Sequence, residues 1–104
     1  MNIDSYQEQA RHYRLPSSNE AYALLNLTAE VGEVAGKVAK HIRDGGDSEV
    51  LRQQIKKELG DVMWMVCAVA DDFALPMSEL CQGNLDKLSD RKQRSVVSGS
   101  GDNR

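Results

Sequence analysis

The chain has 104 residues and a formal net charge of −3, which suits one domain with a single hydrophobic core. The mild negative charge excludes the basic footprint of a nucleic-acid binder. The longest apolar run, Val62 to Ala70, is too short for a membrane span, and the first residues lack a secretory signal pattern. Cys67 and Cys81 are too far apart for a zinc site or a CxxC pair, so we expect reduced core cysteines in a cytoplasmic protein.

The first expected helix covers residues 4–14, which contain no Gly or Pro, and ends at Leu15-Pro16. Its polar character indicates a cover or an arm. Ser17-x-x-Glu20 has the form of a capping box and predicts the start of a long helix that reaches about Arg43. Apolar residues recur along this helix at three- and four-residue steps and define an expected core stripe: Leu24, Leu27, Val31, Val34, Ala35, Val38 and Ile42.

A second stripe of the same helix carries acidic and basic side chains. On a helical wheel it consists of Tyr22, Asn26, Glu30, Glu33, Lys37 and Lys40. Glu30 and Glu33 are three residues apart, so both carboxylates point from one face. Two interpretations are open: a solvated face with a Glu33–Lys37 pair, or a metal site flanked by cations for an anionic ligand.

The next stretch, Asp44-Gly45-Gly46-Asp47, predicts a turn between two helices. A third helix is expected from Asp47 or Ser48 to about Phe73. It contains Glu58-Leu59-Gly60-Asp61, which repeats the acid-x-Gly-acid form of Glu30-Val31-Gly32-Glu33.

The two acidic motifs are predicted to face each other at one level of this helical hairpin. Glu33 precedes Gly46 by thirteen residues and Glu58 follows it by twelve, so both lie roughly 20 Å from the turn. Four carboxylates this close repel one another unless a cation lies among them, and an all-oxygen site suits Mg²⁺ or Mn²⁺. Gly32, Gly36 and Gly60 are poor helix formers, and we expect them to make room for a close helix crossing or for a ligand.

The second half of the third helix, Val62 to Ala70, is apolar on all sides, which is typical of a helix buried all round. A chain of this size cannot surround it alone, so we expect another subunit to cover part of it. Trp64 and Met65 follow Asp61 by one turn. They are expected either in the core or interface, or as the wall of a pocket for a flat base.

A fourth helix is expected with Pro76 in its first turn. Asn84, Lys87, Arg91 and Arg94 share one of its faces. These cations either complement the helix dipole or bind phosphate. The chain is expected to comprise one helical domain over residues 1–94 and a flexible Ser/Gly-rich tail over residues 95–104, whose glycines and Arg104 alternatively close over a phosphate.

These motifs resemble the MazG-like nucleoside triphosphate pyrophosphohydrolases of the all-α NTP pyrophosphatase superfamily. The resemblance extends from about Asn19 to Arg94. The family motif E-x-x-E, a gap, then E-x-x-D stands here as the two acidic motifs separated by 24 residues. Asn84-x-x-Lys87-x-x-x-Arg91 is similar to the family segment that supplies basic residues to the triphosphate, and the Gly-Asp-Asn-Arg ending is similar to tails of some members.

The resemblance implies an antiparallel bundle of about four helices, completed by assembly into a homodimer or a dimer-of-dimers tetramer. It also implies Mg²⁺-dependent cleavage of a nucleoside triphosphate, preferably a deoxynucleotide, to the monophosphate and pyrophosphate, as nucleotide-pool housekeeping. Mn²⁺ is a possible substitute. The second domain that some members carry is not found in this sequence.

The residue types fit that chemistry, because phosphoanhydride cleavage requires charge neutralisation, a positioned water and an oriented leaving group. We expect the metal ligands to be Glu30, Glu33, Glu58 and Asp61, with Glu33 as the general base. The expected phosphate contacts are Lys87, Arg91, Lys37 and Lys40. The candidates for nucleotide contacts are Asn84, Asn26, His12 and Trp64.

Two other functions were weighed. A di-iron carboxylate bundle requires Glu-x-x-His motifs, and neither Glu30 nor Glu58 has a His three residues later. The second alternative is a non-enzymatic helical oligomerisation or interaction module, in which the carboxylates are solvated and the apolar third helix is the partner surface. It predicts no dependence on divalent ions.

Overall fold

A computed structural model describes residues 1–95, 99, 101 and 102, except for the side chain of Glu20. Four α-helices make up the described fold, and no strand is found in these residues. The helices are α1 (Ile3–Arg11), α2 (Glu20–Asp44), α3 (Ser48–Asp72) and α4 (Met77–Gln93). The expected all-α class is confirmed. None of the helices in the described part combines the length and apolar character needed to cross a membrane.

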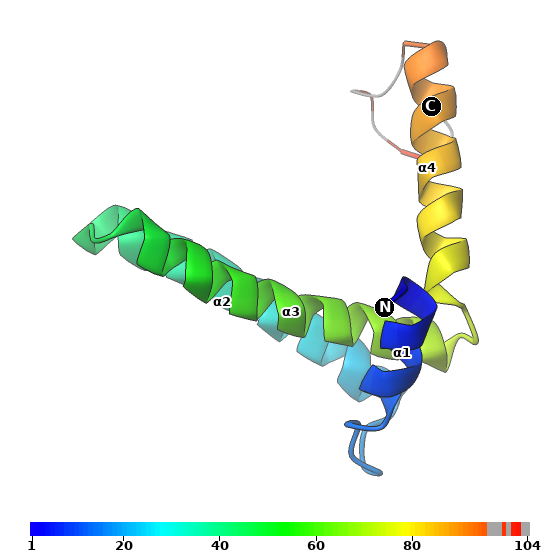
Figure 1. Cartoon of the computed structure of the whole chain (residues 1–104), viewed down its shortest axis with the longest axis horizontal. Helices are drawn as coiled ribbons and strands as arrows, with labels where there is room; N and C mark the ends of the chain where they lie inside the picture. Colours follow the sequence, from blue (N-terminus) through cyan, green and yellow to red (C-terminus); the bar gives the residue numbers. More distant parts are fainter. Residues whose placement is uncertain (96–98, 100, 103–104) are drawn as a thin grey trace.

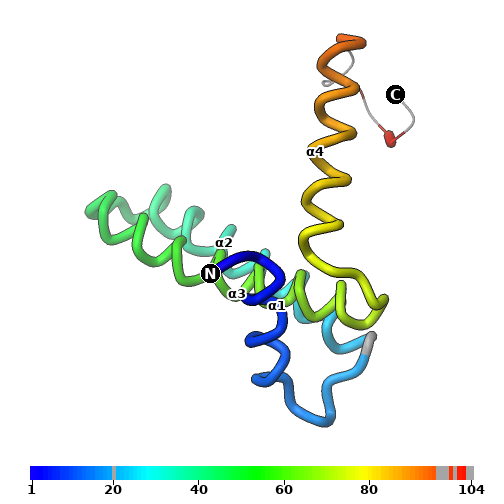
Figure 2. The backbone as a smooth tube through the Cα atoms, turned by 45° about the vertical axis from the view of Figure 1, so that its right-hand side comes forward, coloured from blue at the N-terminus to red at the C-terminus, as the bar shows by residue number. Residues whose placement is uncertain are grey.

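Helices α2 and α3 form a long antiparallel hairpin. The two helices lie side by side along most of their length in both views (Figures 1 and 2). The predicted turn between them is present: Gly45 and Gly46 have φ angles of 73° and 123°, which favour glycine. The Asp47 side chain then accepts hydrogen bonds from the backbone N–H groups of Glu49 and Val50, at 2.7 and 3.2 Å. This capping fixes the start of α3 and therefore the register of the hairpin.

The predicted start of the long helix was wrong in its capping residue. The N-cap is Asn19, whose side-chain oxygen accepts a hydrogen bond of 2.9 Å from the Tyr22 N–H. Asn is as strong an N-cap as Ser, and it stands directly before the first helical residue. The first helix also ends earlier than predicted, at Arg11.

The buried core lies where the start of α2, the end of α3 and the α3–α4 connection meet. It has two small clusters of buried residues: Ala23, Met65 and Ala68 in one, and Cys67, Ala70 and Met77 in the other. The second half of α3 therefore supplies most of the core, as its apolar sequence predicted. Met63 remains 40% exposed, so the helix is not covered on every side.

Most of the predicted core stripe of α2 lies outside this core. Leu24, Val31, Val38 and Ile42 are 58%, 51%, 40% and 79% exposed, whereas Leu27 packs against the first cluster. Cys81 is also exposed, so only Cys67 is a core cysteine. A 3.6-residue period identifies an apolar face, but it does not specify what covers that face.

The helix glycines do not mark a close helix crossing within the chain. A Cβ atom at Gly32, Gly36 or Gly60 would meet nothing within 4 Å. The expectation of a close crossing at these glycines is wrong for the single chain. Space for a ligand or another subunit remains an open use of these positions.

Helix α4 leaves the corner at Ala74 (φ 55°) and projects away from the hairpin, as both views show. It contacts α1 near its N-terminal end. Leu80, Leu85 and Leu88 are consequently 40%, 59% and 39% exposed. In the single chain α4 does not lie along the hairpin as a member of a closed bundle.

Candidate metal and nucleotide site

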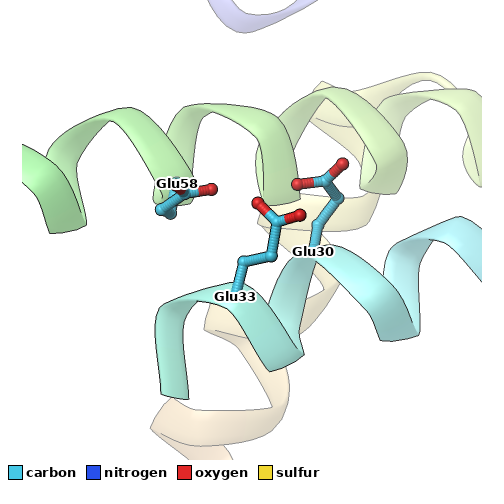
Figure 3. A group of neighbouring side chains, drawn as sticks. All are labelled: Glu30, Glu33 and Glu58. Atoms are coloured by element: carbon cyan, nitrogen blue, oxygen red, sulfur yellow. The ribbon is translucent and has the colours of Figure 1, made fainter. Parts of the chain in front are cut away.

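Three carboxylates from the two acidic motifs converge between α2 and α3. One oxygen from each of Glu30, Glu33 and Glu58 lies within 4.8 Å of the other two. Figure 3 shows the two α2 side chains reaching toward α3, where Glu58 lies. The hairpin therefore brings Glu30, Glu33 and Glu58 to one level, as the count from the turn predicted.

Two of the three carboxylates each have a buried oxygen without a hydrogen-bond donor. The Oε2 atoms of Glu30 and Glu58 are buried and have no hydrogen-bond partner among the described residues. Burial raises the pKa of Glu30, and the charges of Glu33 and Asp61 raise it further, while a hydrogen bond with Asn26 opposes the change. Buried, unpartnered acceptors of this kind normally have a cation or a donor group beside them.

The carboxyl groups of Glu33 and Glu58 interact directly. A hydrogen bond between the two side chains is the largest cause of the raised pKa of Glu58, followed by burial and the Glu33 charge. The positive charge of Lys37 acts in the opposite direction. Two carboxylates this close repel each other when no cation lies between them.

Asp61 lies one turn after Glu58 but outside the compact group. Its side chain is exposed, and it lines a separate cavity of about 500 Å³ together with Gly60, Trp64 and Tyr6. Its charge still raises the pKa of Glu30 and of Glu58, so it adds to the negative potential of the cluster. Three of the four predicted metal ligands are thus grouped, and the fourth stands beside them.

The donor set fits a hard divalent cation. Its ligand atoms are carboxylate oxygens, which Mg²⁺ and Mn²⁺ prefer, and two of them are buried without partners. A cation at this position would satisfy both orphaned oxygens and remove the repulsion among the three side chains. The residues present therefore fit the metal that the two motifs led us to expect.

A cavity of about 280 Å³ adjoins the acidic cluster and shares Glu30 with it. Asn26, Trp64 and the two tyrosines Tyr13 and Tyr22 contribute to its walls. The Trp64 Nε1 atom is buried, and no hydrogen-bond partner for it is found in the described part of the chain. Aromatic walls with a free donor and an amide suit a flat heterocycle that carries acceptor atoms.

The positions of these two tyrosines were not equally predictable from the sequence. Tyr22 belongs to the same stripe of α2 as Asn26 and Glu30, so its position was visible in the helical periodicity, although it was not predicted as a site residue. Tyr13 follows α1 in a non-helical segment. No local pattern connects it with the site, because α1 packs on α3 only in the tertiary structure.

The other predicted nucleotide contacts lie elsewhere. His12 is the C-cap of α1, is exposed and does not contribute to the 280 Å³ cavity. Asn84 lies in a mostly apolar groove of about 640 Å³ between α3 and α4. Neither residue is brought to the carboxylates within the single chain.

The four predicted phosphate contacts fall into two pairs. Lys37 and Lys40 line a cavity near the Gly45-Gly46 turn, and only Lys37 acts on the cluster, through the pKa of Glu58. Lys87 and Arg91 lie on α4, where both form ion pairs with Asp102, at 3.2 and 3.1 Å. Arg94, on the same face by sequence, is paired with Asp90 at 2.8 Å.

Comparison with known proteins places the chain in a family. A family model described as the MazG nucleotide pyrophosphohydrolase domain matches residues 18–96. The Gene 37 protein of Mycobacterium phage L5 is 39% identical over an alignment of 114 positions that covers the whole of both chains. No solved structure matches. The matched region contains both acidic motifs, and the chain belongs to the MazG nucleotide pyrophosphohydrolase domain family.

Proposed function

We propose that the protein hydrolyses nucleoside triphosphates, preferably deoxynucleotides, to monophosphate and pyrophosphate in a Mg²⁺-dependent reaction. The observation that carries this proposal is the convergence of Glu30, Glu33 and Glu58 within 4.8 Å, with buried oxygens that lack partners. Membership of the MazG nucleotide pyrophosphohydrolase domain family supports the same reaction class.

The carboxylates are proposed to hold the metal and to position water. Glu30, Glu58 and Asp61 would act as ligands, together with Glu33. A bound Mg²⁺ would neutralise phosphate charge and lower the pKa of a coordinated water. Glu33 would accept the proton of the attacking water, because its side chain stands between those of Glu30 and Glu58. The water would attack the α-phosphorus, and pyrophosphate would leave.

The cavity beside Glu30 is proposed to hold the base or the sugar. Trp64 would offer its ring face and its unpartnered Nε1–H, and Asn26 would offer its side-chain amide. A base placed there would lie next to Glu30, so its phosphates could extend toward the carboxylate cluster. Asn84 and His12 remain candidates for nucleotide contacts only if another part of an assembly brings them to the site.

The position of α4 supports self-association as part of this function. Lys87 and Arg91 are the proposed contacts of the β- and γ-phosphates, yet α4 carries them away from the hairpin (Figure 1). We propose that a second copy of the chain fills the apolar groove between α3 and α4, giving a homodimer or a pair of dimers. The exposed leucines Leu80, Leu85 and Leu88 would then be buried.

The oligomeric state is tested by analytical ultracentrifugation of the wild type and of Leu85→Glu. We expect a dimer or tetramer for the wild type and a monomer for the variant, because a charge at a leucine that is 59% exposed opposes association without removing a core contact. A monomeric wild type at tens of micromolar protein contradicts the assembly proposal.

The reaction itself is tested by pyrophosphate release from canonical and modified nucleoside triphosphates, with Mg²⁺, with Mn²⁺ and with EDTA. We expect metal-dependent release of pyrophosphate and monophosphate in equal amounts from some of them. No release from any, with the helical circular dichroism intact, contradicts the enzyme proposal. It would favour the non-enzymatic interaction module, whose partner surface would include the exposed leucines of α4.

Metal binding is tested separately from activity by thermal unfolding. Mg²⁺ should raise the melting temperature of the wild type, because a ligand at about 100 times its dissociation constant stabilises the native state by about 2.7 kcal/mol. Glu58→Gln should lose most of that shift. An equal shift in both proteins would show that the cluster is not the metal site.

A further inference from the structure

Gly101 and Asp102 contact two cationic side chains of α4, an interaction that the proposed reaction does not use. The Asp102 Oδ1 atom accepts hydrogen bonds from Lys87 Nζ at 3.2 Å and from Arg91 Nη2 at 3.1 Å. Arg91 also donates to the Gly101 carbonyl oxygen at 3.5 Å. Two cations, one helical turn apart, thus share a single carboxylate oxygen.

The exposure of the three side chains differs sharply. The Arg91 side chain is 7% exposed and that of Lys87 is 46% exposed, whereas the Asp102 side chain is 78% exposed. A buried guanidinium is therefore held in place, and its anionic partner stands at the surface. The acceptor is accessible for exchange with another anion, because the Asp102 side chain is mostly exposed.

The charges of this group are not balanced. Two unit positive charges face one carboxylate, and their pull lowers the pKa of Asp102 below its ordinary value, chiefly through the hydrogen bond from Lys87. An oxygen of a phosphate group has the same hydrogen-bonding capacity as the carboxylate oxygen it would replace. A phosphate anion with two or more negative charges would balance the pair better than Asp102 does.

We propose that Asp102 is an intramolecular competitor for the phosphate site of Lys87 and Arg91, which keeps weakly bound single phosphate groups from occupying that site while polyphosphates still bind. The competition follows from the tether, since Asp102 lies only eleven residues beyond Arg91. A tethered group acts at an effective concentration in the millimolar range. Orthophosphate or a monophosphate must overcome that concentration with few contacts, whereas the phosphates of a triphosphate or of pyrophosphate bring more charge and more acceptors.

The biological role of this competition rests on the proposed function, because it would limit occupation of the site by the monophosphate product. Asp102 would be a competitor for the phosphate site and not a catalytic residue. Its effect would fall on anion binding and on KM for the triphosphate, and it would leave the metal site unchanged.

The test measures anion binding without hydrolysis. The dissociation constants of inorganic phosphate and inorganic pyrophosphate are determined by titration calorimetry on the full chain, without metal and at constant ionic strength. Asp102→Asn should bind phosphate about fivefold more tightly, the factor expected when a mostly exposed ion pair no longer competes. Its gain for pyrophosphate should be similar, because a competitor weakens every anion that displaces it by the same factor.

A matched control is available on the same helix. Asp90→Asn removes one negative charge from a carboxylate that forms an ion pair with Arg94. Among the described residues, Asp90 forms no ion pair with Lys87 or Arg91. This variant should leave both dissociation constants within twofold of the wild type. An equal gain in Asp90→Asn and Asp102→Asn would overturn the proposal, because it would reveal a general charge effect.

A second variant locates the gain. Lys87→Gln combined with Asp102→Asn should lose the tighter phosphate binding, since it removes one of the two cations. Persistence of the gain in the double variant overturns the proposal. Unchanged anion affinity in Asp102→Asn also overturns the proposal, because the contact of Asp102 with Lys87 and Arg91 would then have only a structural role. Because none of these measurements needs turnover, failure here is distinguishable from failure of the pyrophosphohydrolase assay.

Discussion

The side chain of Gln7 on α1 accepts a buried hydrogen bond of 2.8 Å from the backbone N–H of Met77, the first residue of α4. The Nε2 group of Gln7 donates to Asp71 at 2.8 Å and to the Leu75 carbonyl oxygen at 2.9 Å. One glutamine thus joins the end of α3, the connection and the start of α4. Because the side chain of Gln7 is buried, these three bonds have no ready replacement by water.

Replacing Gln7 should destabilise the fold measurably. Gln7→Leu keeps a similar volume but leaves the Met77 N–H without its partner, and an unsatisfied buried donor costs about 1–3 kcal/mol. The free energy of unfolding in urea should fall by that amount. Gln9→Leu, on the exposed side of the same helix, should change it by less than about 0.5 kcal/mol. Equal losses in the two variants would contradict the role assigned to Gln7.

Neutralising Glu33 should separate activity from stability. Glu33→Gln removes the proposed general base, so the rate of pyrophosphate release should fall at least about 100-fold. It also removes one of three mutually repelling carboxylates, so the metal-free protein should be no less stable toward urea. Glu8→Gln, an exposed change on α1, serves as the control for both measurements.

Either half of this prediction can fail independently. Near-normal turnover in Glu33→Gln would remove its assignment as the base while leaving the metal site in place. A clear loss of metal-free stability would show that the Glu33 carboxyl group is required for folding, against the repulsion expected from its neighbours.

The contact between α1 and the start of α4 should depend on the ionisation of Asp4. Asp4 accepts hydrogen bonds from the N–H and the hydroxyl of Ser78, at 2.9 and 2.5 Å. These bonds lower its pKa. A lowered native pKa contributes stability above the unfolded value of about 3.9, and the contribution disappears as the pH falls through the native pKa.

The stabilities of the wild type and of Asp4→Asn should therefore converge on acidification from about pH 6 to about pH 3. Urea midpoints across this range provide the measurement. Asp44→Asn is the comparison: its pKa is also lowered, by the adjacent Arg43, but a contact between sequence neighbours persists in part in the unfolded chain. A constant difference between the wild type and Asp4→Asn at every pH would refute the prediction.

Nucleotide binding should be visible in the emission of Trp64, the single tryptophan of the chain. A base stacked in the cavity beside Glu30 changes the surroundings of the indole, whose Nε1–H lacks a partner in the free protein. Titration of Glu33→Gln with a deoxynucleoside triphosphate should give a saturable change in fluorescence. Inorganic triphosphate should give none, and an equal response to both would exclude the cavity as the base site.

The acidic site was largely predictable because its geometry is local. Glu30 and Glu33 share a helix face through their three-residue spacing, and their level with Glu58 follows from the positions of the residues on either side of Gly46. The prediction required only that the chain reverse at that turn, which the φ angles of Gly45 and Gly46 permit. Asp61 shows the limit of the same argument, since the spacing predicted it within the cluster and the structure places it beside the cluster.

The apolar stripe of α2 was predictable as a pattern and not as a core. Val31 and Ile42 recur with helical spacing, yet both remain exposed in the single chain. Periodicity records which face is apolar, whereas burial depends on which surface packs against it.

The sequence by itself determined the helices, their hairpin and the level at which the carboxylates meet, because each depends on short-range spacing and on glycine and capping chemistry. Only the tertiary structure decided that Asp4 and Gln7 cap α4 from a helix more than sixty residues away, where Pro76 provides no side-chain cap. It alone placed Asp102 against Lys87 and Arg91. Contacts between distant segments depend on the packing of the whole chain, and no local period of the sequence encodes them.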